Sequence, residues 1–283
     1  MKALHIDDKI DLTLDAKLAL RFYANSRPRM LQTAELQKGA IIVCDGKELV
    51  EEGLGIGVPV CRYQDGTRFS LDADTLIDDS DTDPTVMKIY DVNGLASKRF
   101  RGATIERGSS LARLLKVLEK GYRGLGRFRT EASIALDILS MLGMKNEYLA
   151  CTSKGRIAVS YRRNGRGLEI KADLDKLSHE GLRGIVFANE QGGTLFDEYE
   201  DSFGIKLHDR QIEAWGTTQV EWASLRSRVS GLRFRLRRPS GWLIVRGREV
   251  VRNRISWSGL ELFCEGTPQS LEYSVEISRG PGS

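Results

Sequence analysis

The sequence predicts a mainly β protein, a large antiparallel β-sandwich with an inserted helical hairpin, and three observations support it. Short apolar segments alternate with polar residues at period two, and turn residues separate them at the spacing typical of all-β folds. Strands and helices do not alternate strictly, as a Rossmann fold or TIM barrel would require. About fifteen short strands are too many for one flat sheet, so two packed sheets are expected, with a closed β-barrel as the alternative.

The composition is that of a folded, soluble protein. Hydrophobic residues make up 41% and charged residues 29% of the 283 residues, which is enough for one large domain over residues 1–279. The sequence has no apolar run near the roughly 20 residues of a membrane-spanning helix, and the first residues contain no apolar signal region. We therefore expect a cytoplasmic location and no membrane partner. Gly280–Ser283 is typical of a remnant left by cloning.

The first hundred residues read as strands and hairpins. Apolar residues occupy every second position from Leu12 to Phe22, the pattern of a half-buried strand. Ala40–Cys44 forms an apolar run that ends at Asp45-Gly46, a hairpin turn signal. Val58–Tyr63 and Thr67–Leu71 flank a second turn, and Val86–Tyr90 completes this set.

Residues 108–146 break the period-two pattern. Leucines from Leu111 to Leu118 fall at helical spacing, with Ser109 or Ser110 as the cap, and a second helix is expected from Thr130 to Leu142. The glycine-rich basic loop Gly121–Arg129 between them lacks a nucleotide-binding motif, so an ordinary helix connection is favoured over an anion site.

Strand signals return from Tyr148 to Ile277. The expected strands are Ile157–Tyr161, Leu168–Ala172, Ile185–Ala188, Gln211–Trp215, Gln219–Ala223, Leu232–Leu236, Trp242–Val245, Ile255–Phe263 and Leu271–Ile277.

Metal and cofactor binding are not expected. The cysteines are Cys44, Cys61, Cys151 and Cys264, which lie in or beside apolar runs, form no C-x-x-C pair and read as reduced, buried thiols. The histidines are His5, His179 and His208, and none is at ligand spacing to a cysteine. The acidic segment 72–83 resembles the start of a calcium loop, but Pro84 and Tyr90 replace the expected glycine and glutamate, which excludes an EF-hand. A looser calcium site there stays open.

Charge is distributed unevenly, and arginine dominates one segment. Residues 1–96 hold 11 Lys and Arg against 17 Asp and Glu, whereas the remainder holds 32 against 22. Arg226–Arg254 contains ten arginines and one acid, Glu249. In an extended Leu232–Arg237, the side chains of Arg233, Arg235 and Arg237 project from one face. Either acids from neighbouring strands neutralise these arginines or they bind an anionic ligand.

A second candidate site lies around Glu190. This carboxylate follows the apolar strand Ile185–Ala188, and Asp197 lies a few residues further, so the two could act as a general acid/base pair with His179 nearby. His208 is a candidate ligand-binding residue. Trp215 and Trp222 could form an aromatic platform for a sugar ring, although each of these residues also fits a core or surface role.

These features favour a protein that acts on or binds a carbohydrate with an acidic or phosphorylated group. If it is an enzyme, general acid/base chemistry is expected, and no cofactor is needed. Two alternatives remain. The segment Arg226–Arg254 could bind nucleic acid, or the chain could be a structural or oligomeric protein without an active site.

Overall fold

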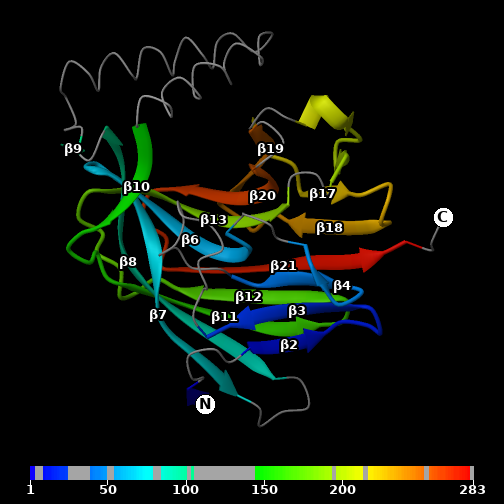
Figure 1. Cartoon of the computed structure of the whole chain (residues 1–283), viewed down its shortest axis with the longest axis horizontal. Helices are drawn as coiled ribbons and strands as arrows, with labels where there is room; N and C mark the ends of the chain where they lie inside the picture. The colour runs from blue at the N-terminus through cyan, green and yellow to red at the C-terminus, as the bar shows by residue number, and fades with distance from the viewer. Residues whose placement is uncertain are drawn as a thin grey trace.

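A computed structural model describes residues 1–3, 9–24, 39–49, 54–78, 84–100, 103–104, 144–192, 196–212, 216–251 and 255–280. Within these residues the chain forms a 17-stranded antiparallel sheet and a separate 4-stranded sheet (Figure 1). The large sheet is not closed, since no described pairing joins its two terminal strands, β15 (Lys206–His208) and β16 (Gly216–Thr218).

The large sheet consists of two arms that meet where β7 (Gly66–Asp78) pairs with β8 (Thr85–Phe100). Register shifts in this pairing, between Phe69 and Ser70 and between Asp72 and Asp74, bend and twist the strands. From β7 the first arm continues through β6 (Ile56–Tyr63), β13 (Leu182–Gly192), β20 (Ile255–Glu265) and β19 (Leu243–Val251) to β16.

The second arm runs in the other direction from β8. It continues through β11 (Arg156–Asn164), β12 (Gly167–Asp173), β21 (Ser270–Arg279), β18 (Leu232–Arg237), β17 (Trp222–Arg226) and β14 (Glu198–Asp201) to β15. A 3-10 helix, η1 (Asp209–Ile212), follows β15. The short strands β1 (Lys2–Ala3), β9 (Ala103–Thr104) and β10 (Met144–Ala150) pair with β7 or β8.

The inner faces of the two arms pack against each other. Phe187 of β13 contacts Tyr273 of β21 edge to face, with ring centroids 6.4 Å apart. The hydroxyl of Tyr161 in β11 donates a hydrogen bond to the carbonyl of Gly57 in β6 over 3.0 Å. Apolar residues from both arms form one continuous buried cluster, so burial of apolar surface holds the arms together.

The 4-stranded sheet covers part of the second arm. It contains β2 (Lys9–Thr13), β3 (Leu18–Tyr23), β4 (Ile41–Cys44) and β5 (Lys47–Glu48). Phe22 of β3 packs on the ring of Tyr161 with a centroid distance of 4.9 Å. Residues of β2, β3 and β4 join the same buried cluster as the large sheet.

The prediction of a mainly antiparallel β fold is confirmed, and several finer expectations are corrected. One folded sheet and a small second sheet replace two large sheets, and no barrel forms. The alternation from Leu12 to Phe22 spans a hairpin, because a bend at residues 14–17 separates β2 from β3. Gln211 and Ile212 belong to η1 and not to a strand. Of the expected helical hairpin at 108–146, residues 144–146 begin β10 and the rest lies outside the described residues.

Candidate functional site

The arginine strand forms as the alternation predicts. In β18, Leu232, Phe234 and Leu236 are fully buried, and their contacts with the core hold the strand in register. The guanidinium groups of Arg233, Arg235 and Arg237 therefore share the outer face of the second arm.

Internal acids lie near two of these three arginines. Arg233 has a guanidinium nitrogen 3.7 Å from a carboxylate oxygen of Glu200, and Arg235 has one 4.0 Å from Glu276. These distances allow charge attraction but exceed the donor–acceptor distance of a hydrogen bond. Arg237 is exposed and has no ion pair within the part of the chain that the structure describes. The arginines are thus partly neutralised and not saturated.

A groove of about 180 Å³ opens on this face between β14, β15, β17 and β18. Its lining residues are Glu198, Tyr199, Glu200, Lys206, His208, Ser224, Arg226 and Arg233. Antiparallel pairing places Glu198, Arg226 and Arg233 opposite one another on neighbouring strands, which brings acidic and basic groups side by side.

Hydrogen bonding orients the groove arginine without using all its donors. The Nε of Arg233 donates to the hydroxyl of Ser224 over 2.9 Å, which fixes the plane of the guanidinium. The Nη1 of Arg226 lies 3.7 Å from the Oε2 of Glu198, and the Nδ1 of His208 lies 3.6 Å from the Oε1 of the same carboxylate. The groove therefore presents positioned donors and acceptors that internal hydrogen bonds leave available.

An aromatic ring lies next to the groove strands. The guanidinium of Arg235 stacks over the ring of Trp222 at 4.1 Å, a cation–π contact. The predicted platform of two tryptophans is not tested, since Trp215 lies outside the described residues.

Asp197 is tied to a neighbouring arginine. Its carboxylate accepts hydrogen bonds from the backbone N–H and the Nε of Arg228, at 2.9 and 2.8 Å. Burial raises the pKa of Asp197, but these bonds outweigh burial, so its pKa lies below the ordinary value. A carboxylate held ionised in this way fixes the turn after β17 and is poorly suited to accept a proton as a general base.

Glu190 pairs with a carboxyl group that the sequence did not single out. Its Oε2 accepts a hydrogen bond from the backbone N–H of Leu54 over 2.8 Å, and its side chain interacts with Glu261 of β20. Burial and the Glu190 carboxylate raise the pKa of Glu261 to about 8, and the charge of Arg62 opposes that rise only in part. At neutral pH the pair therefore holds one proton and one negative charge.

This pair predicts a pH-dependent gain in stability for Glu261→Gln. The unfolded carboxyl loses its proton near its ordinary pKa of 4.5, whereas the folded one keeps it to about pH 8. The contribution of Glu261 to stability therefore falls as pH rises between these values. Relative to wild type, the variant should gain about 2–4 kcal/mol on going from pH 5 to pH 8.5, measured by urea unfolding. Glu276→Gln, at an exposed position, should show no such trend, and a flat difference for Glu261→Gln would contradict the assignment.

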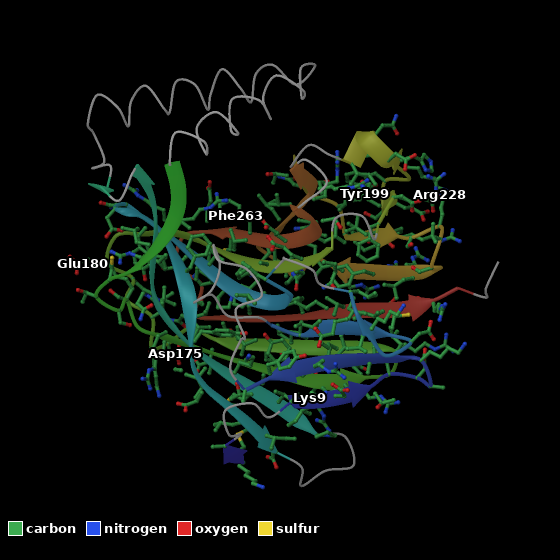
Figure 2. The ribbon with its side chains drawn as sticks, in the orientation of Figure 1. Lys9, Asp175, Glu180, Tyr199, Arg228 and Phe263 are labelled. Atoms are coloured by element: carbon green, nitrogen blue, oxygen red, sulfur yellow. The ribbon has the colours of Figure 1, made fainter. Side chains whose placement is uncertain are left out.

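The three predicted catalytic residues do not form one site. Glu190 lies on β13 in the first arm, whereas Asp197 immediately precedes β14 in the second arm, and the two carboxylates contact different partners. Figure 2 shows Glu180, the neighbour of His179, at the opposite end of the molecule from Tyr199 and Arg228. The expected acid/base pair of Glu190 and Asp197 with His179 nearby is therefore not brought together, because strand pairing, which sequence proximity does not fix, separates these residues.

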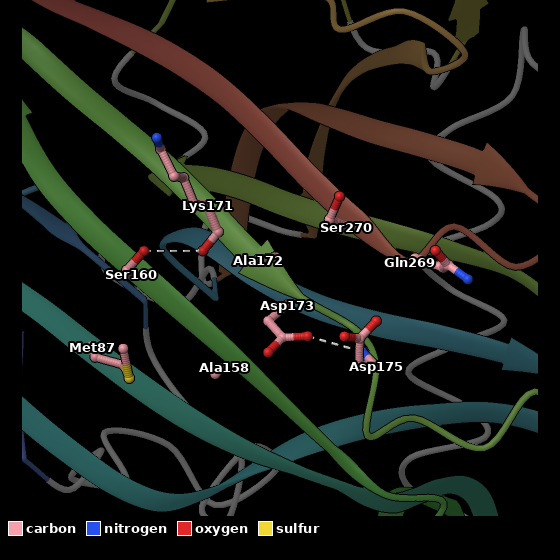
Figure 3. Close-up of a pocket in the computed structure, with 9 residues that line it drawn as sticks. All are labelled: Met87, Ala158, Ser160, Lys171, Ala172, Asp173, Asp175, Gln269 and Ser270. Atoms are coloured by element: carbon pink, nitrogen blue, oxygen red, sulfur yellow. Dashed lines mark hydrogen bonds between the residues drawn. The ribbon is translucent and has the colours of Figure 1, made fainter.

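A larger hollow lies further along the same outer face. It has a volume of about 460 Å³ and includes Ser160, Lys171, Asp173 and Asp175 in its lining (Figure 3). The carboxylate of Asp173 accepts the backbone N–H of Asp175 over 2.9 Å, and Lys171 lies 3.4 Å from Glu169. Local groups already engage these polar side chains, so we place the candidate site in the smaller groove.

Candidate metal ligands do not cluster in the described part of the chain. Among the described residues no group of three or more His, Cys, Asp or Glu is placed to hold a metal ion. Residues 79–83 of the acidic segment lie outside the described residues.

No described helix has the length and apolar character needed to cross a membrane. Cys44 and Cys61 are buried thiols, whereas Cys151 and Cys264 are half-buried.

Comparison with known proteins adds solved structures with low similarity. No protein-family model and no curated protein matches the chain. The Slr1438 protein from Synechocystis sp. PCC 6803 is 10% identical, with a TM-score of 0.44 over 97% of this chain and 96% of that one. A galactose mutarotase-like protein from Lactobacillus casei ATCC 334 is 12% identical, with a TM-score of 0.42 over 96% and 100%. HI1317 is 9% identical, with a TM-score of 0.40 over 96% and 99%. No functional residue of this chain is assigned from these similarities.

Proposed function

We propose that this protein binds a carbohydrate with an acidic or phosphorylated group in the groove between β14, β15, β17 and β18. The observation that carries the proposal is the state of Arg233. Ser224 fixes its orientation at 2.9 Å, while its nearest carboxylate stays at 3.7 Å, beyond hydrogen-bond distance. A positioned guanidinium with free donors facing an open groove loses little entropy when it binds a ligand.

The mixed charge of the groove supports a sugar as the ligand class. Carboxylates of Glu198 and Glu200 accept hydrogen bonds from hydroxyl groups, and the basic side chains donate to hydroxyl oxygens and to an anionic substituent. Three basic residues line the groove against two acids, which leaves a net positive charge for one negative group. Trp222, stacked on Arg235 beside the groove strands, offers an aromatic edge for a ring.

Loss of the Arg233 guanidinium should weaken binding strongly. We expect Arg233→Ala to bind galacturonate at least about tenfold more weakly than wild type in calorimetric titration, because charge-assisted hydrogen bonds are lost. Arg237→Ala is the matched control on the same strand and face, does not line the groove, and should bind like wild type. Galactose, which lacks the carboxylate, should bind more weakly than galacturonate. Equal losses in both variants would contradict the groove as the binding site.

A role in general acid/base chemistry is the second candidate, and the proton on Glu261 favours it. Glu190 and Glu261 together would supply one proton acceptor and one donor, as sugar ring opening requires at neutral pH. Anomer exchange of galacturonate, followed by NMR with wild type and Glu190→Gln, tests this role. Equal exchange rates would exclude it.

Nucleic-acid binding is less well supported, because the arginines of 226–254 do not share one surface. Arg233 and Arg235 lie on the outer face among Glu198, Glu200 and Glu276, whereas Arg246 reaches inward over the ring of Tyr199. Acids interspersed with the bases repel a phosphate backbone. Retention on a single-stranded DNA column at low salt, lost at moderate salt, would favour the nucleic-acid function over the carbohydrate function.

A further inference from the structure

Strand register gathers polar side chains on the inner face of the first arm, away from the groove. Gln191 of β13 lies opposite Ser258 of β20, and Ser258 lies opposite Arg248 of β19. Directly opposed residues in antiparallel strands project to the same side. That side is the inner one, since Asn189, two residues before Gln191, bonds to Tyr273 of the second arm.

A second arginine approaches the same side. Arg246 lies two residues before Arg248, and its guanidinium stacks over the ring of Tyr199 in the second arm at 4.9 Å. Two positions along a strand correspond to about 7 Å. The two guanidinium groups therefore emerge from one strand at a spacing that a single tetrahedral anion can bridge.

The polar atoms of these side chains are buried without partners. Gln191 is 1% exposed, and neither its Nε2 nor its Oε1 has a hydrogen-bond partner among the described residues. The same holds for the buried Nη1 of Arg246 and the buried Nε of Arg248. Burying a hydrogen-bond donor of a charged group without an acceptor costs free energy of folding, and native proteins rarely contain such donors.

Asp201, a buried acid that bonds to Tyr199, is already engaged. Asp201 accepts the hydroxyl of Tyr199 at 2.9 Å and the backbone N–H groups of Phe203 and Ile205 at 2.9 and 3.2 Å. In the described ranges no carboxylate lies within ion-pair distance of Arg246 or Arg248. Two positive charges on the inner face thus have no internal counterion in that part of the chain.

We propose that Arg246, Arg248 and Gln191 form a phosphate-binding site on the inner face of the first arm, separate from the outer groove. The guanidinium groups and the Nε2 of Gln191 donate to the anion oxygens, which gives every unpartnered donor an acceptor. The Oε1 of Gln191 is an acceptor and needs a donor. Hydrogen phosphate carries an O–H that supplies it, whereas sulfate at pH 7 carries none, so the site prefers phosphate.

Calorimetric titration of the full chain with inorganic phosphate tests the proposal. Wild type should bind phosphate saturably and bind sulfate more weakly, and Arg248→Met should weaken phosphate binding at least about tenfold. Gln191→Leu should reduce the preference for phosphate over sulfate. Arg237→Met, on the outer face and outside the groove lining, should bind phosphate like wild type. No saturable binding by wild type, or unchanged binding by Arg248→Met, would overturn the site.

Thermal unfolding shows whether a variant loses phosphate binding because it lacks the binding group or because it fails to fold. Without phosphate, Arg248→Met should be at least as stable as wild type, because it removes a half-buried guanidinium whose buried Nε has no internal partner. Added phosphate should raise the Tm of wild type and raise that of the variant much less. A variant that unfolds readily without phosphate would show that Arg248 has an internal partner, against the proposal.

Glycerol 1-phosphate in place of phosphate separates the two sources of the anion: tighter binding of the ester assigns a phosphomonoester, and equal or weaker binding assigns free phosphate.

Discussion

Asn189→Leu is expected to destabilise the protein by about 4 kcal/mol or more, because it leaves several buried polar groups unsatisfied at once. The Oδ1 of Asn189 accepts the Gly57 N–H at 3.1 Å and the Tyr273 hydroxyl at 2.9 Å. Its Nδ2 donates to the carbonyls of Phe187 and Leu260 at 3.2 and 3.1 Å. Since Asn189 is fully buried, water cannot replace these bonds.

This asparagine links three strands of the first arm to the second arm, so its loss should loosen the packing of the two arms. Urea unfolding followed by circular dichroism measures the effect. Tyr273→Phe removes only one of the four bonds and should cost about 1–2 kcal/mol. A free energy of unfolding for Asn189→Leu within about 1 kcal/mol of wild type would mean that the hydrogen bonds of Asn189 do not hold the arms together.

Gly57→Ala should also be strongly destabilising, by about 3 kcal/mol or more. Gly57 has φ of 82°, which disfavours a side chain, and an added Cβ would lie 2.7 Å from the ring of Tyr161. Tyr161 cannot retreat freely, because its hydroxyl bonds to the Gly57 carbonyl and its ring packs on Phe22 of the small sheet.

A matched glycine separates backbone strain from the clash. Gly46 has a similar φ of 77° but nothing within 4 Å of an added Cβ, so Gly46→Ala should cost only about 1 kcal/mol. Trimming the ring in Gly57→Ala/Tyr161→Leu should make the glycine substitution itself less costly. If Gly46→Ala and Gly57→Ala lose the same free energy of unfolding, the close contact between the arms is not the cause of the destabilisation.

Local patterns in the sequence predicted faces and turns, because these depend on neighbouring residues. The alternation in Leu232–Arg237 correctly placed three arginines on the outer face. Asp45-Gly46 forms the predicted turn, with both residues at positive φ. Strand partners are set by contacts distant in sequence, so the single folded sheet could not be read from these patterns.

The site residues that sequence reasoning missed depend on strand pairing. Glu261 lies between two leucines and looks like an ordinary exposed position, whereas in the fold burial and its proximity to Glu190 raise its pKa. Arg246 offered a local signal, since alternation puts it on the same side as the buried Ile244. An arginine on an apolar face is unusual and would have pointed to the inner site.

Binding of an acidic carbohydrate in the outer groove is tested most directly by NMR mapping of backbone amides. Titration with galacturonate should shift saturably the amides of β14, β15 and β17 and that of Arg233, with little change on β19 and β20. Saturable shifts confined to other strands, or no shifts at millimolar galacturonate, would contradict it.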